Sequence, residues 1–300
     1  MSAVLTSPGP AARPSLLVPA LLACYLIWGS TYLAIRFALE SLPPFLQMGT
    51  RFLVAGSLLM AWLAWRSKDP WPTAVEWRNA LVIGTLMLGG GMGLCAASEQ
   101  YIGSGLIAAF IAVSPMVNSG WGLFFGQKPT RMEFAGMAVG VAGVLLLVRG
   151  ASFAASPVGI ACVAGAVLTW TLASVLTTTK LPLARGAMGF ASEMLCGGAV
   201  LMVVSLALGE QAVLPLQPVS IAAWLYLVVF GSLIAFSAYM YLLAHATPAV
   251  ATSYAFVNPV IALLLGVFVG SEHVTGGEWA ACGVILAGVL LIFRGKSGSS

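Results

Sequence analysis

The sequence predicts an all-α polytopic membrane protein, with ten transmembrane helices arranged as two inverted five-helix repeats around a central cavity. The first observation is composition: 60% of the 300 residues are hydrophobic and 7% are charged, with a mean hydropathy of +1.00. A soluble domain carries about 25% charged residues. The other two observations are a series of ten apolar runs and an internal duplication.

The apolar runs have the length that a membrane span requires. A hydrocarbon core about 30 Å thick needs around 20 apolar residues per helix. The connections between the runs are short, which leaves no room for a separate soluble domain. Charged residues, prolines and glycine clusters divide the chain into spans at 16–39, 44–65, 76–98, 102–125, 131–149, 157–178, 186–208, 219–244, 248–271 and 276–294.

The internal duplication relates residues 105–150 to residues 249–295. Within it, residues 133–150 match the chain 145 positions later at 10 of 18 positions. Each copy would hold five spans, and an odd number threads the second copy through the membrane in the opposite sense. We therefore expect an N-terminal cytoplasmic segment at 1–15, a first repeat at 16–150, a second repeat at 151–295 and a tail at 296–300.

The positive charges predict the orientation. Ten of the 13 lysines and arginines fall on the side of the N-terminus, and only Arg36, Arg51 and Arg149 fall on the other side. Cytoplasmic ends of spans carry the excess of Lys and Arg. Both termini are therefore expected in the cytoplasm.

The sequence gives no sign of catalytic or nucleotide-driven chemistry. No Walker A motif, metal-ligand spacing or Ser-His-Asp elbow is present, and the five cysteines lie in apolar runs without CxxC spacing. We expect no enzyme activity, no cofactor, no metal and no nucleic-acid partner. The expected partners are the lipid bilayer and a small-molecule substrate, and a monomer is compatible with the sequence.

Two prolines stand at matched positions inside predicted spans, Pro115 and Pro259. A proline inside a helix removes one backbone hydrogen bond and clashes with the carbonyl four residues back. The freed carbonyl needs a partner, which a polar cavity supplies; a packing kink between helices is the alternative. The neighbouring polar residues Ser114, Asn118 and Asn258 favour a cavity wall and are candidate substrate ligands.

Two GxxxG pairs follow these prolines, Gly122 with Gly126 and Gly266 with Gly270. Two glycines on one helix face allow a neighbouring backbone to approach closely. We interpret them as packing positions that let helices slide during gating.

Several aromatic and hydroxyl side chains are further candidates for substrate contact. Trp28 and Trp170 lie away from the membrane interfaces where tryptophan usually gathers, so they either pack in the interior or against lipid, or stack on a substrate. Met92 projects from a glycine run that suits a cavity floor. Hydroxyl groups inside spans complete the set, on Thr31, Tyr239 and Tyr254.

Arg51 and Glu193 are charged residues at matched positions within spans. Intramembrane charges are costly and rarely face lipid. Each either extends to the lipid headgroups or has a function, Arg51 as an attractor of a substrate carboxylate and Glu193 as a group that takes up and releases a proton.

The chain resembles the EamA-type family of the drug/metabolite transporter superfamily over about residues 16–294. The resemblance lies in WGSTYLAIRFAL of the first span, Arg51-Phe52 in the second, and the block at 104–147 with its return in the last two spans. Within the family the chain is similar to bacterial amino-acid exporters of the YddG type. One departure is Gly126-Gln127-Lys128, where the family usually has Gly-Glu.

The resemblance implies a bacterial inner-membrane location, a central cavity and export of small metabolites. Inverted repeats usually hold substrate near the membrane midplane. We therefore expect a secondary transporter for neutral or aromatic amino acids that works by alternating access. Export of hydrophobic or quaternary cations is one alternative, and a non-transporting scaffold or an intramembrane enzyme is another.

Overall fold

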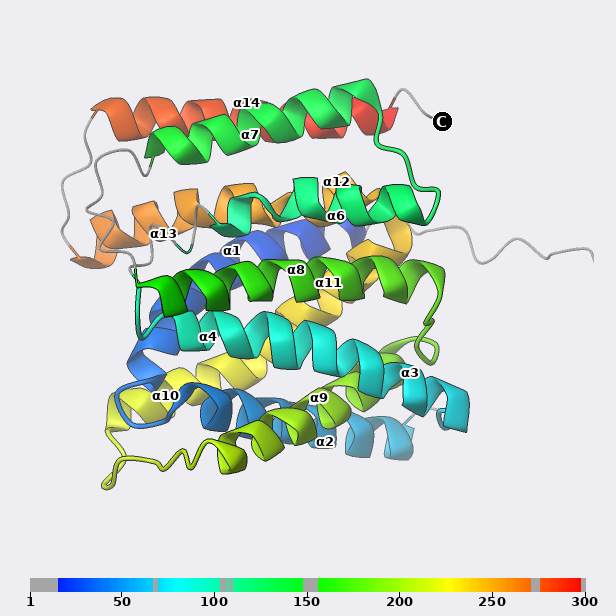
Figure 1. Ribbon diagram of the computed structural model, residues 1–300, viewed down its shortest axis with the longest axis vertical. Coiled ribbons are helices and arrows are strands. Elements are labelled where there is room, and N and C mark those ends of the chain that lie inside the picture. The colour runs from blue at the N-terminus through cyan, green and yellow to red at the C-terminus, as the bar shows by residue number, and fades with distance from the viewer. Residues whose placement is uncertain are drawn as a thin grey trace, which may run out of the picture.

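The computed structural model describes residues 16–66, 70–102, 107, 110–147, 156–270 and 276–297, and every regular element in these ranges is helical (Figure 1). The expected cytoplasmic segment 1–15 lies outside the described residues. So do residues 298–300 of the tail and parts of the spans predicted at 102–125, 131–149 and 248–271.

In the residues that the structure describes, the first half of the chain forms five main helical stretches, of which the third changes its helix type and the fourth follows a short helical turn that ends at Ala112. This third stretch runs without a break from α3 through a π-helical segment, η2, into α4. The elements are α1 (Leu17–Ala38), α2 (Pro44–Arg66), α3 (Ala74–Gly84), η2 (Thr85–Gly93), α4 (Leu94–Ser98), α6 (Ser114–Phe124) and α7 (Arg131–Leu147).

The second half repeats this order. Its third stretch again contains a π-helical segment, η3, and its fourth stretch is divided at Thr252 and Ser253. The elements are α8 (Pro157–Thr179), α9 (Ala187–Ala207), α10 (Pro218–Tyr226), η3 (Leu227–Ile234), α11 (Ala235–His245), α12 (Pro248–Ala251), α13 (Tyr254–Gly270) and α14 (Gly276–Ser297).

Six helical stretches in the described ranges are long and apolar enough to cross a membrane: α1, α2, α3 to α4, α8, α9 and α10 to α11. The others are shorter or less uniformly apolar. For example, α7 and α13 have 17 residues each, and the apolar part of α14 is Trp279–Gly295. The chain is thus an all-helical membrane protein, and the count of ten spans stays a prediction.

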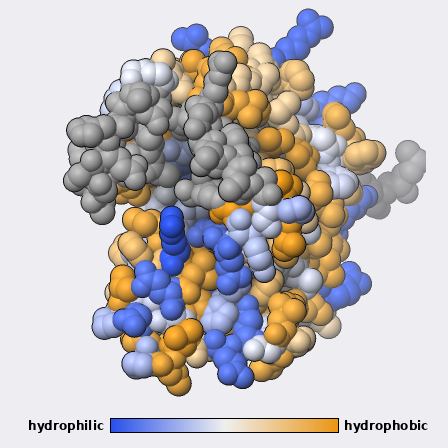
Figure 2. Space-filling view, turned by 60° about the vertical axis from the view of Figure 1, so that its left-hand side comes forward, coloured by the Kyte–Doolittle hydropathy of each residue, from blue (hydrophilic) through white to orange (hydrophobic). Residues whose placement is uncertain are grey.

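Many large apolar side chains lie on the outside of the molecule, as a lipid environment requires. Examples are Trp65, Phe124 and Leu206, each more than 70% exposed. Figure 2 shows apolar side chains spread over much of one face, with hydrophilic groups gathered in patches and at the edges. The buried residues form a core between the helices.

Polar contacts fix several helix ends. Thr73 and Glu76 form a capping box at the start of α3, in which each side chain accepts a hydrogen bond from the other residue's backbone N–H. The Glu210 carboxylate accepts hydrogen bonds from the backbone N–H groups of Phe45 and Leu46, at 3.2 and 2.7 Å, and so caps α2. These contacts satisfy backbone donors that a helix leaves unpaired at its N-terminus.

Two close helix pairs lie at opposite ends of the molecule, α7 with α14 and α2 with α9 (Figure 1). The α7–α14 contact is made of glycines. A Cβ placed on Gly288 would lie 2.6 Å from the backbone nitrogen of Gly140 and 2.8 Å from the backbone oxygen of Gly136. The two backbones approach this closely only because no side chain separates them.

This finding corrects the interpretation of Gly122 and Gly126 as a packing pair. Helix α6 ends at Phe124, and Gly126 has φ +78° with no atom within 4 Å of a Cβ placed on it. Its backbone N–H instead bonds the Leu123 carbonyl, so Gly126 ends the helix in a turn that favours glycine. Gly266 and Gly270 lie in α13, and their packing lies outside the described contacts.

The two prolines also differ from each other. Pro115 is not a kink inside a helix, because the preceding helical turn ends at Ala112 and Pro115 occupies the first turn of α6. A proline is well suited to that position, since its missing N–H would have no helical partner there. Pro259 lies inside α13, as expected.

Candidate functional site

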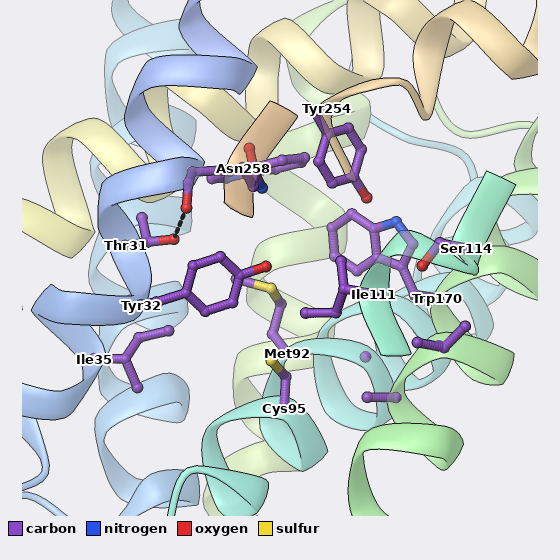
Figure 3. Close-up of a pocket in the computed structure, with 14 residues that line it drawn as sticks. Thr31, Tyr32, Ile35, Met92, Cys95, Ile111, Ser114, Trp170, Tyr254 and Asn258 are labelled. Atoms are coloured by element: carbon purple, nitrogen blue, oxygen red, sulfur yellow. Dashed lines mark hydrogen bonds between the residues drawn. The ribbon is translucent and has the colours of Figure 1, made fainter. Parts of the chain in front are cut away.

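A cavity lies where the two halves of the chain meet (Figure 3). About 70 Å³ of it is open to the centres of water-sized molecules. A single water needs about 10–15 Å³ of such space, so the cavity holds roughly five waters or one small solute. Its lining residues are Trp28, Thr31, Tyr32, Ile35, Gly91, Met92, Cys95, Ile111, Ser114, Ala166, Val167, Trp170, Tyr254 and Asn258.

Most of the predicted substrate ligands come together here, although α1, η2, α6, α8 and α13 contribute them from distant parts of the sequence. The predicted residues in the wall are Trp28, Thr31, Met92, Ser114, Trp170, Tyr254 and Asn258.

The glycine run at 89–93 brings α8 against η2. A Cβ on Gly91 would lie 2.8 Å from the Trp170 ring, and one on Gly90 would lie 2.5 Å from the Thr169 hydroxyl. The run is continuous π-helix and does not interrupt the span. Glycine is therefore needed here for a close side-chain approach, and this approach shapes one wall of the cavity.

Four aromatic rings form a cluster at one end of the cavity: Trp28, Trp170, Tyr239 and Tyr254. The Trp28 ring centroid lies 5.5 Å from that of Trp170, 5.1 Å from that of Tyr239 and 4.8 Å from that of Tyr254. Such tilted and edge-to-face pairs are stabilising beyond the area that they bury. Both tryptophans are thus interior residues, which rules out the lipid-facing alternative.

Asn258 is the polar group with the most unused hydrogen-bonding capacity in the wall. The side chain is 1% exposed, neither amide atom makes a well-formed hydrogen bond, and the Tyr32 hydroxyl of the same wall interacts with the amide. An unsatisfied buried polar group costs about 1–3 kcal/mol. None of the lining residues carries a formal charge.

Two predicted ligands lie elsewhere. Asn118 is one helical turn beyond Ser114 on α6 and lines a second cavity, together with Gln127, Ser174 and Thr178. About 80 Å³ of this second cavity is open to the centres of water-sized molecules. Asn118 therefore lines a different cavity from Ser114, and its contact with substrate stays a prediction.

Tyr239 lies between the two cavities and lines neither in the described structure. It is 0% exposed. Its hydroxyl accepts a hydrogen bond from the Trp170 Nε1 at 3.2 Å and shares one with the Ser174 Oγ at 2.7 Å. Trp170 faces the first cavity and Ser174 the second, so this chain of three side chains forms a barrier between them.

Arg51 and Glu193 are both buried, so neither extends to the membrane surface. Arg51 donates from Nε to the Ser232 Oγ at 2.7 Å, while its Nη2 has no hydrogen-bond partner. A Cβ on Gly231 would lie 2.6 Å from this Nη2, and the Gly231 carbonyl accepts a 3.3 Å hydrogen bond from the Trp28 Nε1. Arg51 thus lies directly behind the cavity wall.

Comparisons with known proteins agree with this architecture. The model of the EamA-like transporter family matches residues 16–149 and 157–294. The chain belongs to the EamA-like transporter family. A relative in Escherichia coli (strain K12), the uncharacterized inner membrane transporter YedA, is 41% identical over 282 residues, which cover 92% of this chain and 90% of the relative.

This EamA-type transporter is also similar to two other proteins at lower sequence identity. Protein PecM of Dickeya dadantii is 26% identical, covering 89% of this chain and 86% of PecM. A solved crystal structure superimposes with a TM-score of 0.77 at 20% identity, covering 96% of this chain and all of the other, and shows a shared fold. The family and the relatives' names agree with the expectation that the chain is not an enzyme.

Sequence reasoning missed several lining residues of the EamA-type transporter, notably Tyr32, Cys95 and Ile111. Cys95 lies three residues after Met92, which helical periodicity could have indicated. The π-helical turns of η2 precede it, however, and an extra residue per turn rotates the face that follows. Tyr32 lies four residues after Trp28 on α1, so helical periodicity could have indicated it as well, whereas Ile111 carried no local signal.

Removing the Tyr239 hydroxyl from the barrier should destabilise the protein. Replacing Tyr239 with phenylalanine leaves the Trp170 N–H without its partner and removes the bond to Ser174, whereas Tyr25→Phe removes one 2.7 Å hydrogen bond to Ser253 in a partly buried position. We expect Tyr239→Phe to cost about 1–3 kcal/mol and Tyr25→Phe about 0.5–1.5 kcal/mol. Melting temperatures of both variants in detergent measure the difference, and equal shifts would contradict the barrier described here.

Proposed function

We propose that this EamA-type transporter is a secondary carrier that exports small amphipathic metabolites, and that neutral and aromatic amino acids are its preferred substrates. The observation that carries the proposal is the cavity between the two halves. Its wall is uncharged, mostly apolar and aromatic, and contains one buried amide, that of Asn258, whose nitrogen and oxygen make no well-formed hydrogen bond. Ligand sites are usually of this kind, apolar with a few placed polar groups.

The amide of Asn258 suits a zwitterion. Its nitrogen donates to a carboxylate and its oxygen accepts from an ammonium group, so one side chain serves both charged ends of an amino acid. Trp28, Trp170 and Tyr254 then contact the apolar part of the substrate. The open volume fits a small side chain, so an aromatic substrate requires the tryptophan rings to move.

We further propose that the ten helical stretches all cross the membrane and form two inverted repeats. The family model matches the chain twice, at residues 16–149 and 157–294. Corresponding helices pack together, α2 with α9 and α7 with α14, and the two π-helical segments start 142 residues apart, at Thr85 and Leu227. These pairings support a two-fold relation between the halves.

The proposed location is the bacterial inner membrane, with both termini in the cytoplasm. The ten-to-three distribution of Lys and Arg supports this orientation, and YedA is named an inner membrane transporter. In this orientation the main cavity lies towards the outer side, and the second cavity beside Asn118 lies towards the cytoplasm. Alternating access then consists of opening the Tyr239 barrier while the outer side closes, with the helix breaks before Ser114 and before Tyr254 as places to bend.

Export of quaternary cations is the competing function. Aromatic rings attract such cations through their π-faces, and four rings meet here. A cation carrier would gain from a carboxylate in the wall, and none of the lining residues supplies one. The wall therefore favours a zwitterion.

Counterflow in proteoliposomes tests the proposal. Liposomes loaded with unlabelled threonine, methionine or phenylalanine should take up the same amino acid in labelled form, and protein-free liposomes should not. A parallel experiment uses a labelled quaternary ammonium dye. Flux of the dye with no flux of any amino acid would overturn the proposed substrate class.

A further inference from the structure

Glu193 is the least satisfied ionisable group among the residues that the structure describes. It lies in α9, its side chain is 0% exposed, and neither carboxyl oxygen has a hydrogen-bond partner. A native structure seldom leaves a buried polar side chain entirely unpaired, and each such group calls for an explanation. The main cavity does not explain why Glu193 is unpaired, because Glu193 is not among the residues that line this cavity.

An ionised carboxylate cannot persist in this environment. Removing an isolated charge from water costs far more than any single contact returns, and such groups take up a proton instead. No basic side chain in the described structure lies within hydrogen-bonding distance of Glu193. The structure therefore accommodates the neutral, protonated carboxyl group.

Of the two matched charged residues, only Glu193 lacks any hydrogen-bond partner, as a comparison with Arg51 shows. It occupies the matching position in the first half and is equally buried, yet it donates to Ser232 and contacts the Met48 sulfur at 3.5 Å. An arginine is always charged and cannot exchange its proton under ordinary conditions. Of the two matched residues, only Glu193 can change its charge.

The position of Glu193 connects it to the barrier between the cavities. Helix α9 packs on α2, α3, η2 and α11. Two titratable groups that interact electrostatically with Glu193 are Cys196 on the same helix and Tyr239 on α11. The ionisable residues of α2 and α3 are Arg51, Arg66, Glu76 and Arg78, η2 has none, and α11 carries Tyr241 and His245 besides Tyr239. No hydrogen bond joins any of them to a Glu193 oxygen. A charge that appears on Glu193 therefore reaches Tyr239.

We propose that Glu193 carries the proton whose inward movement drives export. This inference rests on the proposed transport function. A proton from water on the outer side forms an O–H bond with the carboxylate, and the neutral carboxyl group is the form stable in the closed barrier. When the inner side opens, the O–H bond breaks and the proton passes to water on that side. The resulting carboxylate attracts the Tyr239 hydroxyl and weakens its bonds to Trp170 and Ser174.

Accumulation driven by a pH gradient tests this proposal. One pH unit is worth about 1.4 kcal/mol per proton and so sustains about a tenfold concentration ratio of substrate. Proteoliposomes with wild-type protein and a gradient of one unit should accumulate labelled threonine about tenfold. Glu193→Gln has nearly the same shape and cannot release a proton, so it should exchange threonine in counterflow but reach a ratio of about one. Glu193→Asp should recover part of the accumulation.

Gln47→Leu is the matched control. Gln47 is also buried in a packed helix of the same pair, and both atoms of its amide lack a hydrogen-bond partner. It carries no exchangeable proton, so Gln47→Leu should accumulate threonine as the wild type does. Accumulation that persists in Glu193→Gln, or a wild type that exchanges threonine but ignores the gradient, would overturn the proposal and leave the transport function intact.

A second measurement keeps the proposal testable if no amino acid is transported. The infrared difference spectrum between the reconstituted wild type and Glu193→Gln at neutral pH should show the carbonyl band of a protonated carboxyl group in the wild type, since other buried carboxyl groups such as Glu99 contribute equally to both. A wild type without it would contradict proton binding at Glu193 independently of any substrate. Failure of counterflow with the band present would instead count against the proposed substrate class.

Discussion

Gly288→Ala is expected to lower the stability of this transporter sharply, although it adds a single methyl group. The new Cβ would lie 2.6 Å from the Gly140 nitrogen and 2.8 Å from the Gly136 oxygen, both of them backbone atoms. Backbone atoms cannot rotate away as a flexible side chain does, so α7 and α14 must separate. Overpacking costs about 1–3 kcal/mol in a well-packed core, and we expect the upper end of that range or more.

The matched control lies on the same helix. A Cβ on Gly283 meets no atom within 4 Å. Gly283→Ala therefore only improves helix propensity, and we expect it to stabilise the protein by about 0.5–1 kcal/mol. The melting temperatures of the two variants in detergent should shift in opposite directions. A neutral Gly288→Ala would mean that the α7–α14 contact is looser than described.

Asn258→Leu is expected to abolish most transport without reducing stability. Its amide makes no well-formed hydrogen bond within the protein apart from a contact with the Tyr32 hydroxyl, so an apolar replacement loses little hydrogen bonding. Hydrogen bonds to charged groups are worth about 1.5–3 kcal/mol each, and the loss of two to a bound zwitterion lowers kcat/KM by about a hundredfold or more. Initial rates of threonine counterflow and the melting temperature measure the two effects.

Asn118→Leu is the control for Asn258→Leu. It shows whether transport is lost because Asn258 binds the substrate or because a buried amide has been removed. Asn118 is 2% exposed and its Oδ1 is unpaired, but it lines the second cavity. We expect its kcat/KM to stay within a few-fold of the wild type. Equal losses in the two variants would place the substrate outside the main cavity.

Composition, hydrophobic runs and the internal duplication are local or repetitive properties, and they were readable from the sequence. They predicted an all-helical membrane protein and most helix bounds to within a few residues. Candidate side chains chosen by their chemistry, such as Trp28, Trp170 and Asn258, lie together in the cavity wall. Polar or bulky groups inside apolar spans tend to face the interior, because lipid cannot satisfy them.

Other features depended on how each helix is rotated and which helix faces it. The GxxxG pattern at Gly122 and Gly126 looked like the packing contact, but the close glycine contact lies at Gly136, Gly140 and Gly288. A spacing pattern identifies a possible face and cannot say whether another backbone is placed against it. The π-helical turns rotate the residues that follow them, which no periodicity of 3.6 anticipates.

By itself, the sequence determined the class of the protein and its two-copy construction, because hydrophobic length and repetition are properties of the chain alone. Only the tertiary structure decided that Tyr239 separates two cavities, that Asn118 belongs to the second, and that Glu193 is buried without a partner. Burial and pairing depend on atoms brought in by other helices. A residue's own neighbours in sequence do not specify them.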